Sequence, residues 1–282
     1  MLFDWLPASI WRYLVVAAGA VLLLVIAYAS LVERFRIEEC RVRIVLDRLP
    51  RAFSGMRIAL LSDIHLGAFY GPRRLSKVVD LINRSQPDII CLVGDLTSGR
   101  IAWGYRKAVP ELSRMRARLR KLAVLGNNDY AQGPDQVKST LELGGFQVLV
   151  NDCFPVGEGN ERLFLAGLDD VIEGEPKPER VMRKVPDGAC RILLVHEPDY
   201  SEYLQPRFDI DLQLSGHSHG GQFCLPGIGP IITTKMGRKY LSGLYRLGGM
   251  QIYTTRGIGT TLLPMRLFCR PEVSLLVLEA LE

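Results

Sequence analysis

The sequence predicts an α/β fold that follows an N-terminal membrane helix. Short apolar runs of strand length alternate with amphipathic helical segments, a rhythm that is typical of parallel β-α-β units. A separate stretch of about twenty residues lacks any charge and is long enough to cross a bilayer. Several of the apolar runs end in histidine, aspartate or asparagine. The chain has 282 residues, of which 48% are hydrophobic. It can therefore supply one mid-sized domain with a large core plus an appendage.

The appendage is the N-terminal apolar stretch. Residues 13–32 contain no charged residue, and as a helix they would span about 30 Å, the thickness of the hydrocarbon layer. Trp5, Trp11 and Tyr13 lie where an interfacial aromatic belt is expected. A cleaved signal peptide is the competing interpretation, because Ala27-Tyr28-Ala29 fits a cleavage site. We favour a retained anchor, because the apolar run continues beyond that site.

The charges on either side of this helix predict its orientation. Four arginines follow it within about a dozen residues, whereas only Arg12 precedes it within the chain. Positive flanks remain in the cytoplasm, which places the C-terminal domain there. The six cysteines show no pairing or zinc-binding spacings and so indicate reduced thiols. The net charge of +5 is too small and dispersed to indicate nucleic-acid binding. We expect the protein to be a monomer.

Three regions are expected along the chain: 1–36 as the anchor and its flank, 37–54 as a linker with a first strand, and 55–282 as the main domain. Residues 74–83 form the clearest helix, because apolar residues recur on one helical face, and a second helix is expected from 134 to 143. Strands are predicted from their apolar runs at 56–62, 89–95, 122–126, 148–151, 162–168, 192–195, 210–214, 244–247, 251–254 and 273–278.

The four histidines of the chain, His65, His196, His217 and His219, each follow one of these apolar runs. Strand ends in α/β proteins line the crevice in which ligands bind. Three oxygen-bearing side chains stand at equivalent places, and these are Asp63, Asp95 and Asn127. A mixed nitrogen and oxygen set of this kind, which is not sulfur-rich, suits borderline or hard divalent ions such as Mn, Fe, Zn or Ni. The sequence therefore predicts one metal-binding place at the strand ends.

Together these motifs resemble the calcineurin-like metallophosphoesterase superfamily. The five blocks are Asp63-x-His65, Gly94-Asp95, Gly126-Asn127-x-Asp129, His196 and Gly216-His217-x-His219. Residues 216–222 and 255–272 look like the membrane-associated bacterial branch, which includes a UDP-2,3-diacylglucosamine diphosphatase of lipid A synthesis. The resemblance implies a four-layer αββα sandwich of two mixed sheets. It also implies a single-pass protein of the bacterial inner membrane.

The resemblance also implies a pair of divalent cations, for which manganese is expected and iron, zinc, nickel or magnesium are alternatives. Asp63, His65 and His219 would hold the first cation and Asn127, His196 and His217 the second, with Asp95 bridging both. A hydroxide shared by the cations would attack phosphorus. The substrate implied is a lipid-linked or nucleotide-linked diphosphate such as UDP-2,3-diacylglucosamine.

One position departs from the family pattern. The family has histidine where this chain has Asn128, which donates a hydrogen bond but cannot supply a proton to a leaving group. Asn128 and Asp129 are the candidate catalytic residues, and Arg256 and Arg266 the candidate phosphate-binding residues. The substitution favours a diphosphate substrate, whose leaving group needs little protonation. A broader phosphodiesterase or phosphomonoesterase, and a metal-bound binding module weakened in catalysis, remain alternatives.

Overall fold

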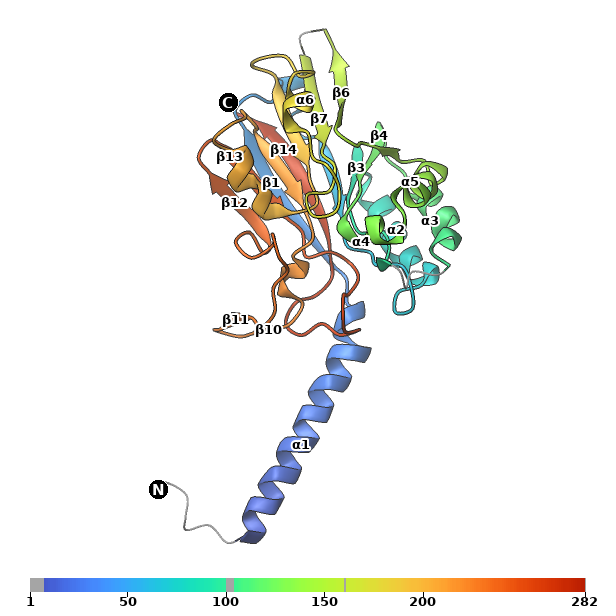
Figure 1. The fold of residues 1–282 in the computed structure, drawn as a ribbon, viewed down its shortest axis with the longest axis vertical. Coiled ribbons are helices and arrows are strands. Elements are labelled where there is room, and N and C mark those ends of the chain that lie inside the picture. The colour runs from blue at the N-terminus through green and yellow to red at the C-terminus, as the bar shows by residue number, and fades with distance from the viewer. Residues whose placement is uncertain (1–7, 100–103, 160, 282) are drawn as a thin grey trace.

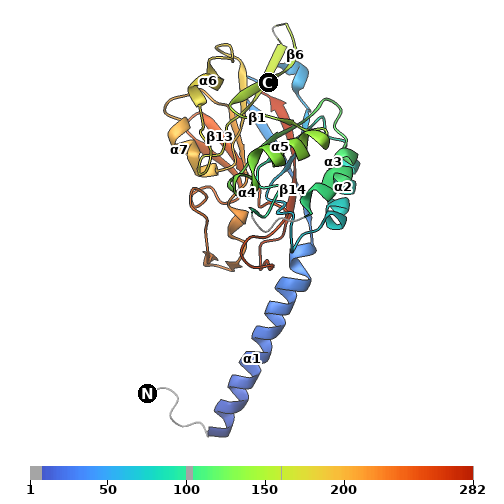
Figure 2. The same ribbon diagram turned by 45° about the vertical axis from the view of Figure 1, so that its right-hand side comes forward.

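Two six-stranded sheets pack face to face, with helices on both outer faces (Figure 1). The computed structural model describes residues 8–99, 104–159 and 161–281. Figure 2 shows helices α2 (Pro72–Ser85) and α3 (Val109–Arg114) on one side and α6 (Pro178–Met182) and α7 (Ser201–Leu204) on the other. The predicted sandwich of two mixed sheets and an N-terminal apolar helix is confirmed.

The first sheet has the order β1-β14-β2-β3-β4-β5. Its strands are β1 (Glu38–Leu46), β2 (Arg57–Leu61), β3 (Ile89–Val93), β4 (Arg120–Val124), β5 (Gln147–Val148) and β14 (Glu272–Ala280). All neighbouring strands are parallel except β14 and β2. Every residue of β3 is buried, as expected for a parallel strand that is covered on both faces. Segment 37–54, which the sequence predicts to be a linker with a strand, contributes β1 to this sheet.

The second sheet has the order β12-β13-β9-β8-β7-β6. Its strands are β6 (Asp152–Glu158), β7 (Glu161–Gly167), β8 (Cys190–Leu194), β9 (Leu212–Ser215), β12 (Gly243–Leu247) and β13 (Met250–Thr254). The four central strands are parallel, and the two edge strands are antiparallel to their neighbours. Their carboxyl ends therefore lie at one edge of the sheet.

The core lies in three layers, one between the sheets and one beneath the helices on each outer face. Leu60, Leu194 and Leu276 belong to the fully buried inter-sheet layer. Fully burying such a side chain contributes about 1.5–3 kcal/mol. On the first sheet, α2 buries its apolar stripe together with α3 and α5 (Pro134–Leu143). On the second, Val181 and Leu204 anchor α6 and α7.

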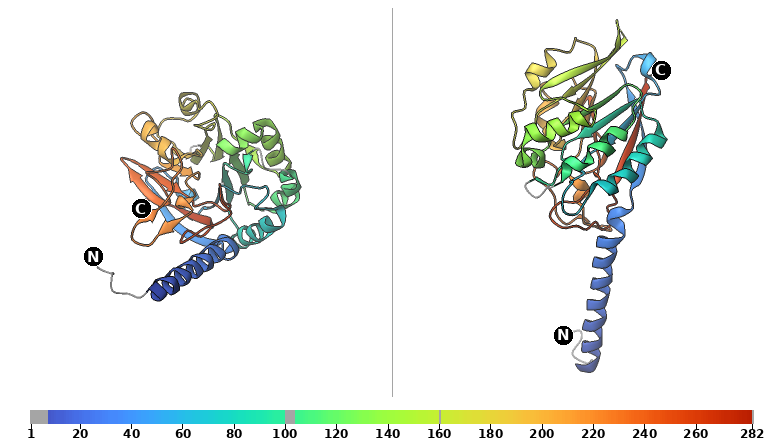
Figure 3. Two further views of the ribbon diagram at one scale, coloured as in Figure 1. Left: turned by 60° about the horizontal axis from the view of Figure 1, so that its bottom comes forward. Right: turned by 90° about the vertical axis from the view of Figure 1, so that its right-hand side faces the viewer.

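Helix α1 (Ala8–Leu31) projects from one end of the sandwich (Figure 3). Within the described residues, Ile10–Phe35 is the one helical stretch long and apolar enough to cross a membrane. The last turn is joined to the domain, because the amide of Arg266 donates to the carbonyl of Ala29 at 3.1 Å. Residues 1–7, including the predicted belt residue Trp5, lie outside the described residues.

A candidate metal centre at the strand ends

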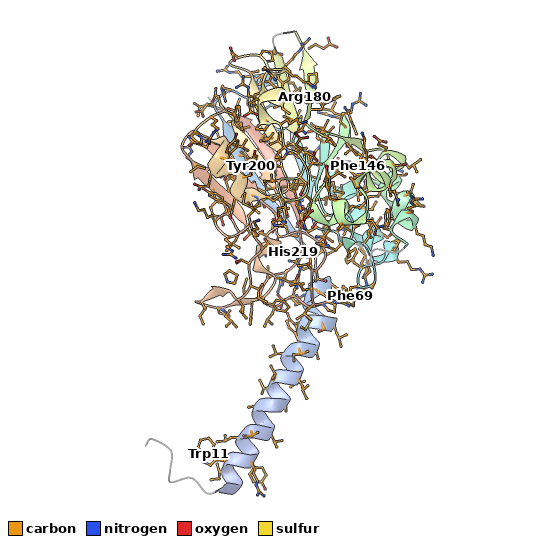
Figure 4. The ribbon with its side chains drawn as sticks, in the orientation of Figure 1. Trp11, Phe69, Phe146, Arg180, Tyr200 and His219 are labelled. Carbon is orange, nitrogen blue, oxygen red and sulfur yellow. The ribbon has the colours of Figure 1, made fainter. Side chains whose placement is uncertain are left out.

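Six of the seven residues expected to bind metal come together from both sheets, and the seventh, Asn127, follows Gly126, whose backbone adjoins Asp95 and His196. Asp63 and His65 follow β2, Asp95 follows β3, and Asn127 opens α4 (Asn127–Gln132) after β4. His196 follows β8, and the two remaining histidines follow β9. Figure 4 shows His219 at the end of the domain from which α1 leaves.

One half of the cluster contains Asp63, His65 and His219. The Nε2 atoms of the two histidines lie 3.1 Å apart, and their rings stack with centroids 4.9 Å apart. Nε2 of His219 lies 3.4 Å from Oδ1 of Asp63. That Oδ1 atom is buried and accepts no hydrogen bond within the described part of the chain. A buried carboxylate oxygen without a donor is costly unless a cation neutralises it.

The other half contains His196 and His217. Nε2 of His196 lies 3.2 Å from Nδ1 of His217. The opposite nitrogen of each ring lies within hydrogen-bond distance of a backbone carbonyl, His196 at 2.8 Å from Val93 and His217 at 2.7 Å from Lys235. These contacts to backbone carbonyls turn the other nitrogen of each ring toward the cluster. Oδ1 of Asn127, the residue after Gly126, is buried without a partner among the described residues.

Asp95 lies between the two halves. Its Oδ2 is 3.5 Å from Nε2 of His65 and 3.4 Å from Nε2 of His196. Asn128 binds both oxygens of this carboxylate, since its backbone amide donates to Oδ1 at 2.9 Å and its side-chain amide to Oδ2 at 2.8 Å. Asn128 therefore lies directly against the centre of the cluster.

The charges of the cluster depend on one another. Burial opposes an ionised Asp95, but His196 and His65 outweigh it and hold the pKa of this carboxyl well below its usual range. Burial likewise opposes a charged His196, yet Asp95 and Asp63 raise the pKa of that imidazole well above its ordinary value. Burial lowers the pKa of His219 to about 3, against the attraction of Asp63. One protonated imidazole and one neutral imidazole therefore stand beside the carboxylates.

Five of the seven predicted ligands have a left-handed backbone. The φ angles are 51° for Asp63, 50° for His65, 53° for Asp95, 64° for His217 and 53° for His219. Residues other than glycine adopt this conformation at a cost of about 1–3 kcal/mol each. The surrounding fold must supply that free energy, so the geometry is fixed in advance. Such strain concentrates at functional sites.

Gly126 is required by the close approach of its backbone to the cluster. A Cβ atom there would overlap Oδ1 of Asp95 and Nε2 of His196. We expect Gly126→Ala to destabilise the protein by about 1–3 kcal/mol, because backbone must shift in a packed interior, and to remove metal binding. Thermal unfolding and metal titration measure both effects. Gly249→Ala is the control, since a Cβ at that glycine has open space; an equal loss in both variants would contradict this reading.

Asp129 supports the cluster from behind. Its Oδ1 accepts from the amide of Thr97 at 3.0 Å, and its Oδ2 accepts from the amides of Leu96 at 3.3 Å and Gly126 at 3.1 Å. Burial and the nearby charge of Asp95 raise the pKa of Asp129 to about 7. The carboxyl group is fully buried. Its hydrogen bonds join the loop after β3 to the start of α4. These bonds indicate a positioning role, and the catalytic role expected from the sequence stays a prediction.

The two arginines expected to bind phosphate have protein partners instead. Nε of Arg256 donates to Glu272 at 2.5 Å, and its Nη2 donates to Glu38 at 3.0 Å. Arg266 is fully buried, and its guanidinium donates to backbone carbonyls of the loops around residues 256–259 and 269. Arg266 thus joins the loops beneath His219. Phosphate binding by either arginine stays a prediction.

Glu197 was not predicted from the sequence, although it directly follows His196. It is fully buried, and together with His196 and His217 it forms a third set of potential ligand atoms. Burial, a hydrogen bond shared with Asp170 and the charge of Asp170 raise the pKa of Glu197 well above its usual value, despite the opposing attraction of His196. The sequence signal that could have pointed to it is the pair Asp169-Asp170, which follows β7.

A cavity of about 260 Å³ adjoins the cluster at His219. Phe223, Ile232, Leu262 and Leu263 contribute apolar side chains to its walls. Residues from two separate segments, 218–234 and 261–263, line it. The cluster is thus polar and buried, while the space beside it suits an apolar group.

Comparisons with known proteins agree with this arrangement. A model of the calcineurin-like phosphoesterase family matches residues 56–221. The uncharacterized metallophosphoesterase YkuE of Bacillus subtilis is 36% identical over 257 residues, covering 90% of this chain and 89% of the relative. The phosphodiesterase YaeI of Escherichia coli is 32% identical over 225 residues, with coverage of 79% and 82%.

Two further proteins are similar to this chain over only part of their own length. A Danio rerio protein named as a transmembrane protein with metallophosphoesterase domain is 34% identical over 254 residues, covering 84% of this chain but 56% of the relative. The sulfate thiohydrolase SoxB of Thermus thermophilus has a TM-score of 0.53 at 14% identity, covering 80% of this chain and 57% of that one, which shows the fold alone. From the family match and the relatives together, the chain belongs to the calcineurin-like phosphoesterase family.

Proposed function

We propose that the protein is a membrane-anchored phosphoester hydrolase that works with two divalent cations. The observation that carries this proposal is the convergence of four imidazoles on Asp63 and Asp95, with buried oxygens of Asp63 and Asn127 that lack hydrogen-bond donors among the described residues. These atoms fit cations, since carboxylate and amide oxygens accept only and the ring nitrogens are directed inward.

The two halves of the cluster divide the ligands. Asp63, His65 and His219 would hold one cation, and the other would be held by Asn127, His196 and His217. Asp95 would bridge them, because its Oδ2 is nearly equidistant from His65 and His196. The donor set suits Mn²⁺, Fe²⁺, Zn²⁺ or Ni²⁺, and we expect manganese to support activity best, with magnesium as a further possibility.

Bound cations would activate water and neutralise the phosphoryl oxygens. The remaining chemistry belongs to the chain itself. Asn128 would donate from its side-chain amide to a phosphoryl oxygen, after giving up its present bond to Asp95. It supplies no proton, so it cannot protonate the leaving group. Asp129 would keep Asp95 and Gly126 in register by its three backbone hydrogen bonds.

The substrate that fits best is a phosphorylated amphiphile. The cavity beside His219 offers apolar walls, and a phosphate-type leaving group compensates for the missing proton donor. A lipid-linked diphosphate such as UDP-2,3-diacylglucosamine is therefore the first compound to test. A lipid phosphodiester is the second, because the Escherichia coli relative is named a phosphodiesterase.

The apolar helix and the relatives named as transmembrane proteins suggest membrane association. We propose that α1 crosses the bacterial inner membrane once and is retained. The arginines that follow it would keep the catalytic domain on the cytoplasmic side. We further propose that the chain acts as a monomer.

Metal binding should tighten as pH rises, because a cation must displace the proton that the raised pKa of His196 retains. Displacing one proton gives about a tenfold gain in affinity per pH unit until pH passes that pKa. In the metal-free protein the sign is opposite: His196 stabilises the fold below the ordinary imidazole pKa, and this contribution is lost as pH rises through the raised value. Calorimetric titrations in buffers of different ionisation enthalpy count the protons released. Affinity that does not change with pH would contradict this assignment.

A substrate panel tests the proposed function. The full-length protein in detergent is assayed with Mn²⁺, Mg²⁺, Ni²⁺ and Zn²⁺ on UDP-2,3-diacylglucosamine, a lipid phosphodiester and a soluble phosphomonoester. We expect the two lipid substrates to be hydrolysed and the monoester to be nearly inert. Preference for the soluble monoester would overturn the amphiphile, and hydrolysis of none of them with any metal would favour a metal-bound binding module.

A further inference from the structure

The end of the domain nearest α1 exposes large apolar side chains from two separate segments. We call this set the apolar rim: Ile228, Ile231, Ile232, Leu262, Leu263 and Phe268. Ile228 is 79% exposed and Leu262 is 82% exposed, so these are nearly free side chains. The hairpin of β10 (Cys224–Leu225) and β11 (Gly229–Pro230) lies at this same end of the molecule in Figure 1.

The two segments lack the charges that ordinarily accompany exposed apolar residues. Residues 223–234 contain no charged side chain, and neither do residues 257–265. Ile232, Leu262 and Leu263 line one cavity, so the two segments adjoin. Exposed apolar side chains gathered without charges mark an interaction site.

The rim is held in place by the chain. Nε2 of Gln222 donates to the carbonyls of Thr261 at 2.9 Å and Leu263 at 3.1 Å, and its Oε1 accepts from the amide of Thr261 at 2.9 Å. Leu262 and Phe268 have φ angles of 59° and 51°. A left-handed backbone is unfavourable for both residue types, and folding gains nothing by exposing their side chains. We attribute both the strained backbone and the exposed side chains to an interaction with a partner outside the domain core.

The rim is also fixed relative to α1. The amide of Arg266 donates to Ala29 at 3.1 Å, and the amide of Cys269 donates to Glu33 at 2.8 Å. These two residues flank Phe268, so the rim lies at the level of the last helical turn. Nearby, the guanidinium groups of Arg34 and Arg74 lie over the ring of Phe35 at 4.3 and 3.8 Å. Basic and aromatic groups of this kind suit the headgroup region.

We propose that the apolar rim inserts into the interface of the same bilayer that α1 crosses, so that the domain docks on the membrane by two separate elements. This inference rests on the proposed membrane span. Ile232, Leu262 and Leu263 also line the cavity beside His219. The cavity therefore borders the lipid, and an amphiphile reaches the metal centre from the bilayer without crossing water. The shallow insertion expected is about 5–10 Å, as for interfacial helices.

Photocrosslinking of the full-length protein in vesicles tests the docking without any activity assay. The variants Leu262→p-benzoylphenylalanine and Ile228→p-benzoylphenylalanine are reconstituted in vesicles of phosphatidylethanolamine and phosphatidylglycerol, irradiated and examined by mass spectrometry. Position 143 in α5 is the matched control, because Leu143 is also exposed, at 69%. Position 24 in α1 reports whether the helix is in the bilayer. We expect lipid adducts at 262, 228 and 24, and none above background at 143.

Other outcomes overturn the inference in distinguishable ways. Lipid adducts at 24 but none at 262 and 228 would leave the anchor in place and refute the docking. Adducts of the rim to a second copy of the chain would make the rim a dimer interface. Equal lipid adducts at 143 would show that contact is unspecific. Absence of adducts at 24 would remove the membrane span itself, and with it this inference, while leaving metal-dependent hydrolysis untouched.

Discussion

Asp95→Asn is expected to reduce hydrolysis by about 10³-fold, since several kcal/mol of charge stabilisation are lost and each 1.4 kcal/mol is a factor of ten. The substitution keeps the volume of the side chain and the hydrogen bond from the backbone amide of Asn128, and it removes the negative charge between the two halves of the cluster. Without that charge, the mutual repulsion of the two cations that the cluster would hold is no longer offset. Rates with saturating metal, together with metal content, measure the effect.

The control is Asp80→Asn, which also removes one carboxylate charge, from the exposed face of α2 where Asp80 pairs with Arg114. Surface pairs of this kind contribute about 0–1 kcal/mol, so its rate should be unchanged. Near-normal activity of Asp95→Asn at saturating metal would refute the bridging role.

Asn128→His is expected to accelerate hydrolysis of substrates with alkoxide leaving groups by about 10²–10⁴-fold, the usual contribution of a placed general acid. Asn128 already donates to Asp95 from the centre of the cluster, so an imidazole at this position would be within reach of a bound phosphate. Substrates with a diphosphate or nitrophenolate leaving group should gain little, because these groups depart without a proton. The ratio of rates for an alkyl ester and a nitrophenyl ester, compared between the two proteins, isolates this effect.

The matched variant is Asn128→Gln, which keeps an amide donor and supplies no proton. It should show no gain for alkyl esters. An equal acceleration of both ester classes by Asn128→His would mean that the imidazole acts on binding or metal placement and not on the leaving group.

That these side chains gather at one place could be predicted, because the carboxyl ends of parallel strands lie at the same edge of a sheet. The sequence contains four histidines, and each follows an apolar run. The backbone conformation that turns these side chains toward one another could not be predicted. The left-handed φ angles of Asp63, His65 and Asp95 depend on packing from both sheets, and local propensity disfavours them.

The partners of Arg256 could not be predicted from the sequence. Arg256 lies in a glycine-rich segment near the site, which is typical of phosphate-binding loops. Its partner Glu38 is 218 positions away in the sequence and reaches it because β1 pairs with β14. Long-range pairing of this kind leaves no local signal, so the sequence could not show that the guanidinium already has carboxylate partners. The same pairing brings segment 37–54 into the first sheet.

Counting the metal ions bound per chain tests the central claim most directly. Full-length protein loaded with Mn²⁺ and freed of excess metal by dialysis is analysed by elemental mass spectrometry beside a His196→Ala/His217→Ala double variant. We expect two ions per chain in the natural sequence, as a two-cation site requires, and no more than one in the variant, which retains Asp63, His65 and His219. Fewer than one ion in the natural protein, or two ions retained by the variant, would contradict the assignment of the metal centre.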